Sequence, residues 1–131
     1  MIVTFTPNPS IDRTVSVPRL EHGEVLRATS SRIDPGGKGI NLARALTLHG
    51  TPSRAILPAG GPEGHLLAEL LTRSGTPYAA VPIEGTTRMN IAVIEPDGTT
   101  TKLNEPGPSL TDDELAAVLS AIDVQLRSGA S

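Results

Sequence analysis

Hydrophobic residues along the chain follow two alternating patterns, short β-branched runs and longer stretches with helical spacing. The short runs predict buried strands at residues 2–6, 53–61 and 77–83. Between them, apolar residues recur at helical spacing over residues 39–50 and 63–75, and each stretch closes on a glycine that suits a helix C-terminus. Strand–helix–strand units of this kind predict an α/β fold with a parallel sheet.

Other segments alternate apolar and polar residues, which is typical of half-exposed strands and not of a buried parallel sheet. They cover residues 13–17, 25–33 and 88–104. In the last of them Asp97 and Gly98 predict a two-residue hairpin turn. We expect these strands to form a small separate sheet, a lid over one end of the parallel sheet.

A final helical pattern spans residues 110–129 and starts with a capping box formed by Thr111 and Glu114. Asp112 and Asp113 suit the positive end of this helix. No strand pattern follows it, so we expect only part of an α/β domain, with uncovered helix faces that favour aggregation or association. The apolar stripe of the helix consists of Leu115, Val118, Leu119, Ile122 and Leu126.

Composition excludes several classes of function. The chain has 131 residues, no cysteine, and a formal net charge of −3 with scattered basic residues, which argues against a nucleic-acid surface and thiolate metal sites. We see neither a signal peptide nor an apolar run long enough for a membrane span, so we expect a cytoplasmic protein without nucleic-acid or membrane partners. The three histidines lack metal-ligand spacing, and no metal site is predicted: His22, His49 and His65.

The glycine turn at Gly36, Gly37 and Gly39 is the first candidate site. Glycine lets a ligand approach the backbone, a helix N-terminus attracts anions, and Lys38 adds a cation. Asn41 lies in the first turn of the helix that follows. A sharp turn with a solvated lysine explains the same residues equally well. The spacing fits neither a Walker A loop nor a dinucleotide fingerprint.

Other polar residues cluster by sequence near the same edge of the sheet. Asp12, just after the first strand, is able to accept hydrogen bonds from sugar hydroxyls or simply to cap a turn. Arg88 opens the hairpin and suits either a phosphate or an exposed edge strand. Arg27, in an alternating strand, is a weaker candidate. Asn104 and Glu105 begin a rigid "NEPGP" loop that is able to line a site.

Several stretches together resemble a known family. They are "TFTPNPSIDRT", "PGGKGINLARALTLHG", "ILPAGGPEG", "TTRMNIAVIEPDGTTTKLNEPGP" and the capped helix after it. In this order they are similar to the N-terminal portion of PfkB-type carbohydrate kinases of the ribokinase-like superfamily, in the branch of 1-phosphofructokinases and tagatose-6-phosphate kinases. The resemblance implies part of a three-layer, Rossmann-type α/β body with a β-sheet lid. The lid strands would lie at about residues 14–33 and 88–104.

The resemblance also implies roles for individual residues. Asp12 would hold sugar hydroxyls, Gly36, Gly37 and Asn41 would contact the sugar, and Lys38 and Arg88 would engage its phosphate. The weaker candidates are Arg27, Asn104 and Glu105. The implied reaction is phosphorylation of fructose 1-phosphate by ATP with Mg²⁺, giving fructose 1,6-bisphosphate. Tagatose 6-phosphate and fructose 6-phosphate are the alternative substrates, and lids of the family commonly pair into homodimers.

The sequence departs from the family in one respect. Members are longer, and their catalytic base is an aspartate in a Gly-x-Gly-Asp motif near the nucleotide site. This sequence contains no Gly-x-Gly-Asp. We therefore expect residues 1–131 to be the N-terminal part of one domain, without the ATP-binding and catalytic part, and to be inactive alone. The alternatives are a non-catalytic sugar-phosphate-binding or dimerising fragment, and an unrelated α/β binding module.

Overall fold

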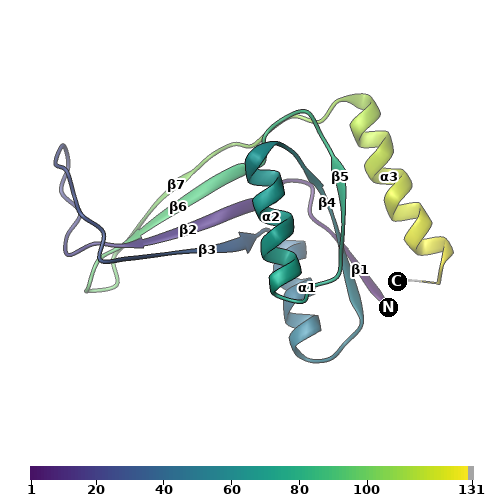
Figure 1. Ribbon diagram of the computed structural model, residues 1–131, viewed down its shortest axis with the longest axis horizontal. Helices are drawn as coiled ribbons and strands as arrows, with labels where there is room; N and C mark the ends of the chain where they lie inside the picture. Colours follow the sequence, from purple (N-terminus) through teal and green to yellow (C-terminus); the bar gives the residue numbers. More distant parts are fainter. Residues whose placement is uncertain (130–131) are drawn as a thin grey trace.

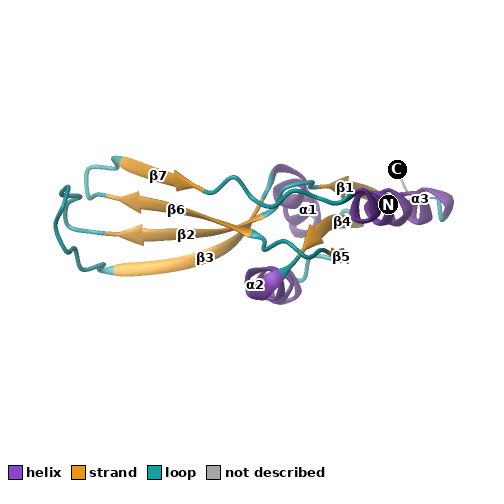
Figure 2. Ribbon diagram, turned by 90° about the horizontal axis from the view of Figure 1, so that it is seen from above, coloured by secondary structure: helices purple, strands orange, loops and turns teal. Residues whose placement is uncertain are grey.

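The computed structural model describes residues 1–129 of the chain. Three parallel strands form the body of the molecule. Two helices, α1 (Lys38–Leu48) and α2 (Gly61–Arg73), cover one face of this sheet, and α3 (Asp112–Arg127) covers the other (Figures 1 and 2). The predicted three-layer α/β architecture is therefore confirmed. The strands, in spatial order, are β1 (Ile2–Phe5), β4 (Ser53–Ala59) and β5 (Tyr78–Pro82).

A second sheet of four strands, which we call the lid, projects from the α1 and α2 side of the body (Figure 2). The central pair, β2 and β6, is parallel, and both outer pairs are antiparallel. The strands, in spatial order, are β3 (Ser30–Gly36), β2 (Ser10–Ser16), β6 (Arg88–Ile94) and β7 (Thr100–Asn104).

The paired residues of β2 and β3 differ from the strand ranges that the sequence predicted. Pairing begins at Ser10 and Gly36, so it reaches the glycine turn itself. It ends at Ser16 and Ser30, because Pro18 follows shortly and has no amide N–H to continue the ladder. Residues 25–29 were expected in a strand and belong instead to the connection at the tip of the lid.

The hairpin of β6 and β7 forms, but its loop is longer than the predicted two-residue turn. The Glu95 amide donates to the Thr99 carbonyl and the Gly98 amide donates to the Glu95 carbonyl, each at 2.9 Å. Pro96 and Asp97 therefore occupy the centre of the turn, and Gly98 follows with a φ of 90°. Proline prefers the first central position, which moves the turn by one residue from the expected place.

The core lies between the parallel sheet and the helices α1 and α2. Ile11, near the base of β2, is buried in the same cluster, so the lid is packed into the body at this point. The opposite layer is less covered, because Val118 is the buried side chain of α3. The other members of the core cluster are Ile40, Ala43, Ala55, Leu57, Leu67 and Leu71.

Candidate functional site

The candidate site lies where the end of β1, the base of the lid and the start of α1 meet. α1 begins at Lys38, and its N-cap residue is Gly37, with a φ of 128° and no side-chain capping bond. No acidic residue occupies its first turn. The first turn therefore keeps N–H groups that no capping side chain satisfies, and such groups favour an anionic ligand.

Asp12 lies directly beside this turn. The structure places it inside β2, whereas the sequence suggested a position just after the first strand and before the lid strands. The Ser10 hydroxyl donates to Asp12 Oδ1 at 2.7 Å. A Cβ atom on Gly36 would collide with Asp12 Oδ2, so the carboxylate lies against the Gly36 backbone. The side chain is half-buried, which leaves part of the carboxylate accessible to a ligand.

Residues at the end of β1 pack against the same turn. A Cβ atom on Gly39 would lie 2.5 Å from Thr6 Oγ1 and 2.8 Å from the Phe5 carbonyl oxygen. α1 therefore rests on the strand backbone, which only glycine permits at this position. Thr6 is buried, and its Oγ1 has no hydrogen-bond partner among the described residues.

Lys38 and Asn41 extend from the first turn of α1, and both are exposed. Lys38 forms no ion pair with any residue from 1 to 129. The Asn41 backbone amide donates to the Gly37 carbonyl at 2.8 Å, so the helical hydrogen bonds of α1 begin with this pair. The sequence-predicted residues Asp12, Gly36, Gly37, Lys38 and Asn41 therefore come from one small region.

Arg88 lies at the base of β6 and joins two loops. Its NH2 group donates to the Asn8 carbonyl at 3.0 Å, and its NH1 group is 3.4 Å from the Glu105 carbonyl. The Asn8 side chain in turn donates to the Pro106 carbonyl at 3.0 Å. The Arg88 Nε atom is buried without a partner. Arg88 thus ties the segment after β1 to the "NEPGP" loop.

Glu105 also has a structural partner. Its Oε1 atom accepts a hydrogen bond from the Met89 amide at 2.6 Å. Arg88 and Glu105 both line a cavity of about 340 Å³ with Glu63 and the "NEPGP" loop. Arg88 and Glu105 therefore border this cavity while their hydrogen bonds hold its walls in place.

A polar face of the lid continues from Asp12. In the strand register Asp12 lies opposite Asn90, and Asn90 lies opposite Asn104. The Asn90 Oδ1 atom is buried and has no partner among the described residues. This face lines a cavity of about 500 Å³, whose polar lining includes Asp12, Thr14, Arg32, Asn90, Lys102 and Asn104.

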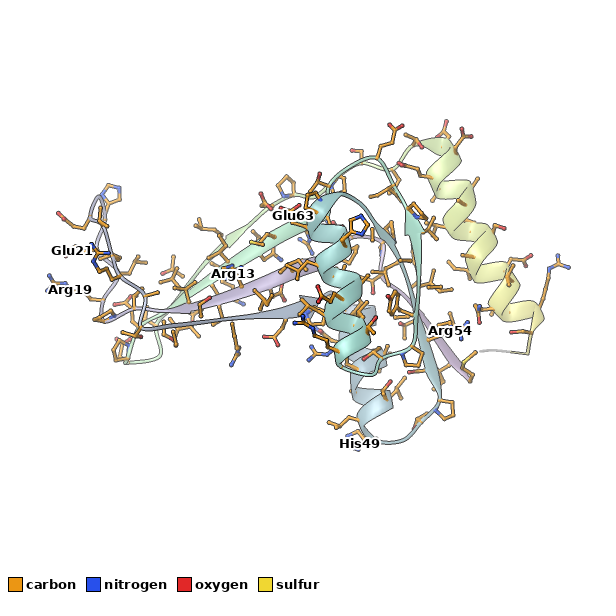
Figure 3. The ribbon with its side chains drawn as sticks, viewed as in Figure 1. Arg13, Arg19, Glu21, His49, Arg54 and Glu63 are labelled. Atoms are coloured by element: carbon orange, nitrogen blue, oxygen red, sulfur yellow. The ribbon has the colours of Figure 1, made fainter. Side chains whose placement is uncertain are left out.

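Sequence reasoning missed Asn8, Ser10 and Asn90. Side chains alternate between the two faces of a strand, so the sequence of residues 88–94 places Asn90 on the same face as Arg88. This alternation was the signal that could have identified Asn90. The contact between Asn8 and Pro106 joins residues distant in the sequence and gave no local signal. Arg27, by contrast, is not part of this region. It belongs to the connection after Ser16, at the far end of β2 from Gly36, where Figure 3 labels Arg19 and Glu21.

The connection from β5 to β6 is held by α3. Glu114 Oε2 accepts a hydrogen bond from the Glu84 amide at 2.7 Å, and Glu114 Oε1 accepts one from the Thr111 amide at 2.9 Å. Both bonds hold the pKa of Glu114 below its usual range, and the bond from the Thr111 amide has the larger effect. The predicted capping box is therefore present and also fixes the loop before Arg88.

A three-layer α/β body with a β-sheet lid is the fold that this chain shares with solved ribokinase-like structures. The structure of ribokinase from Thermotoga maritima has this fold, with a TM-score of 0.65 and 21% identity over 82% of this chain. The family model "pfkB family carbohydrate kinase" matches residues 6–129, and the chain belongs to this family of carbohydrate kinases.

Two relatives of higher identity carry phosphofructokinase names. The chain is 43% identical over 113 residues to the ATP-dependent 6-phosphofructokinase isozyme 2 of Mycobacterium tuberculosis, covering 84% of this chain and 33% of that protein. It is 34% identical over 119 residues to the 1-phosphofructokinase of Bacillus subtilis, covering 91% of this chain and 39% of that protein. The chain thus spans less than half the length of these relatives.

A solved structure matches more closely in shape. The phosphofructokinase-2 of Escherichia coli in complex with fructose-6-phosphate superposes with a TM-score of 0.89 at 35% identity, covering 94% of this chain and 41% of that one. No helix within residues 1–129 is both long and apolar enough to cross a membrane. The same residues contain no cluster of three or more His, Cys, Asp or Glu side chains that could hold a metal ion.

Proposed function

We propose that this chain forms the acceptor-binding half of a sugar-phosphate kinase and binds a phosphorylated ketohexose. One observation carries the proposal: the Asp12 carboxylate lies against Gly36 at the uncapped N-terminus of α1. A carboxylate accepts hydrogen bonds from sugar hydroxyls, and the N–H groups of a helix N-terminus favour a phosphate. A sugar phosphate needs both features side by side.

The proposed roles follow from the contacts of each residue. Asp12 accepts sugar hydroxyls, the backbone at Gly36 and Gly37 and the side chain of Asn41 contact the sugar, and exposed Lys38 pairs with the phosphate. Arg88 already donates to two backbone carbonyls, so its first role is to position the loops. Its 3.4 Å bond to Glu105 is the one that a phosphate would most readily replace.

The remaining candidates also divide into residues of the sugar site and residues with a structural role. Asn104 lines the cavity that contains Asp12, so we assign it to the sugar site together with Asn90. The Glu105 carboxylate is engaged by the Met89 amide, which supports a structural role. We leave Arg27 out of the site of a single chain, because it lies beyond the far end of β2.

We place fructose 6-phosphate before fructose 1-phosphate, the substrate that the sequence resemblance suggested, with tagatose 6-phosphate third. The relative of 43% identity is named a 6-phosphofructokinase, and the 1-phosphofructokinase of Bacillus subtilis is 34% identical. In the whole enzyme ATP, with Mg²⁺, would donate the phosphoryl group to a sugar hydroxyl. Such transfer depends on positioning and on neutralisation of charge.

Titration by NMR tests the binding proposal. The amides of Gly36, Gly37 and Asn41 should shift in a saturable way with fructose 6-phosphate, and the Asp12→Asn and Lys38→Gln variants should weaken binding by about tenfold or more. Asp97→Asn, at the hairpin tip, is the control and should bind normally. Absence of shifts at the glycine turn in a folded sample would refute the proposal.

We further propose that the chain alone does not turn over substrate, because its sequence contains no Gly-x-Gly-Asp motif. A coupled assay for ADP release with fructose 6-phosphate and fructose 1-phosphate should give no signal above a blank. Turnover that Asp12→Ala abolishes would contradict this expectation.

A homodimer through the lid is the second candidate function, and it is compatible with the first. The face of the lid opposite Asp12 carries Ile91 and Leu103, and Leu103 is 63% exposed. The proposed pair would bury this apolar face. Size-exclusion chromatography with light scattering should report a dimer for the wild-type chain, and Leu103→Lys should convert it to a monomer. A wild-type monomer at high concentration would contradict this.

A further inference from the structure

A closed ring of hydrogen bonds joins three segments at the base of the lid. The Arg88 NH2 group donates to the Asn8 carbonyl at 3.0 Å, and its NH1 group lies 3.4 Å from the Glu105 carbonyl. The Asn8 side-chain amide closes the ring, because it donates to the carbonyl of Pro106, the residue after Glu105, at 3.0 Å. The ring therefore connects the segment between β1 and β2, the start of β6 and the loop after β7.

The loop after β7 is held at two points. At the first, Glu105 Oε1 accepts a hydrogen bond from the Met89 amide at 2.6 Å. At the second, the Asn8 side chain holds the Pro106 carbonyl, and a Cβ atom on Gly107 would collide with Asn8 Oδ1. Gly107 has a φ of 85°, so glycine suits this position on both counts. The main-chain carbonyl of Glu105, between these points, is thus fixed in place.

Arg88 is only weakly bonded on the side of this loop. Its 3.4 Å contact with the Glu105 carbonyl is longer than the usual distance of about 2.9 Å. Its Nε atom is buried without a partner, and no acidic side chain within residues 1–129 forms an ion pair with it. Arg88 and Glu105 line the cavity of about 340 Å³. The arginine is thus a charged donor with spare hydrogen-bonding capacity beside a cavity.

The two points of attachment explain why the long contact does not shorten. A flexible loop would close on the guanidinium until its carbonyl reached an ordinary distance, because a full hydrogen bond to a charged donor is stronger than a stretched one. The bonds from Met89 and Asn8 hold the loop back from this position. Of the two, the Asn8 bond comes from outside the hairpin of β6 and β7, so it ties the loop to the body.

We propose that Asn8 is a positioning residue for the phosphate of the sugar phosphate and acts through Arg88. By holding the loop, its side chain leaves the NH1 group able to donate to a phosphate oxygen at the loss of only a weak contact. The Asn8 side chain itself is engaged by the loop and not by the ligand. The inference rests on the proposed function, because it requires a sugar phosphate at the glycine turn, and it adds a residue that sets the affinity from a distance.

A double-mutant cycle between Asn8 and Arg88 tests this role. Fructose 6-phosphate is the probe, and its affinity is measured by NMR from the shifts of the Gly36 and Gly37 amides. Asn8→Ala removes the bond to Pro106 without adding a charge and should weaken binding by about tenfold. Arg88→Gln should weaken it by a similar factor. Asn8→Ala should then cause no further loss, because both changes remove the same interaction.

Two comparisons separate positioning from a general effect on the fold. In the Asp12→Asn background, Asn8→Ala should still weaken binding by about tenfold, because Asp12 contacts a different part of the ligand. Gln125→Ala removes a side-chain amide from α3, outside the ring, and should leave the affinity unchanged. The Arg88 Nε–H signal should shift on addition of fructose 6-phosphate in the wild type and should stay in place in Asn8→Ala.

Asn8→Asp is the second variant, for use if Asn8→Ala does not fold. It keeps the size of the side chain, donates no bond to Pro106 and should weaken binding at least as much. Circular dichroism verifies the folding of each variant. Unchanged affinity in either folded variant, or losses from the Asn8 and Arg88 variants that add, would overturn the proposal and leave the proposed function intact. Absence of any saturable shift in the folded wild type would overturn both.

Discussion

The two faces of the body sheet use similar amphipathic helices with different results. Leu67 and Leu71 of α2 are completely buried, whereas Leu119 of α3 is more than half exposed. α2 packs against β4 and also against the base of the lid, while α3 has only a narrow three-stranded sheet beneath it. An apolar stripe therefore predicts a helix and its inward side, and the contacts that the helix makes beyond the sheet, here with the lid, decide how much of that stripe is buried.

The largest expected effect comes from the covered face. Leu67→Ala should lower the free energy of unfolding by about 2–5 kcal/mol, because it leaves a cavity in the core between α2 and the sheet. Leu119→Ala should change it by about 0.5 kcal/mol or less. Urea denaturation of both variants measures the difference. Equal losses would mean that α3 is as firmly packed as α2.

The next effect separates two glycines of one turn. Gly39→Ala should destabilise the fold by about 1–3 kcal/mol, because the new methyl group meets the backbone of Phe5. Gly36→Ala should cost much less, because it meets the movable ends of the Asp12 and Ser10 side chains. It should instead displace the Asp12 carboxylate and weaken sugar-phosphate binding. Thermal melts and the NMR titration distinguish the two variants, and a reversed order would contradict the account.

A smaller effect concerns the N-terminus of α3. Thr111→Ala removes the capping acceptor of the Glu114 amide and should cost about 1 kcal/mol, measured by urea denaturation. Thr111→Ser retains the hydroxyl and is the control. A loss that Thr111→Ser shares equally would point away from capping.

The smallest effect is a dependence on pH. Hydrogen bonds from the Thr111 and Glu84 amides hold the pKa of Glu114 below the ordinary value of a glutamate in the folded chain. The folded state therefore binds this proton less tightly than the unfolded state, so the contribution of Glu114 is present above that value and is lost as the pH falls below it. Glu114→Gln should flatten the stability profile in this acidic range. A profile identical to wild type would contradict the assignment.

Much of the architecture was readable from the sequence because it depends on local signals. Helical periodicity, the glycines after α1 and α2, and the pair Thr111 and Glu114 each indicate one element. The lid was less readable. β2 and β6 are parallel neighbours far apart in the sequence, and Ser10 and Gly36 pair only because the lid continues into the glycine turn.

The candidate site divides in the same way. Gly36, Gly37 and Lys38 share one local motif, so their proximity followed from the sequence. The bond of Arg88 to the Asn8 carbonyl depends on the tertiary fold, and a charged residue at a strand start gave no indication of it. Asn90 became a candidate only when the register placed it between Asp12 and Asn104.

We propose that the glycine turn and Asp12 bind a sugar phosphate without the rest of a kinase. A titration of the isolated chain with fructose 6-phosphate, followed at the Gly36, Gly37 and Asn41 amides, tests it most directly. We expect saturable shifts at these amides that Asp12→Asn strongly weakens and that ATP does not produce. Shifts confined to other regions, or equal shifts in the Asp12→Asn variant, would contradict it.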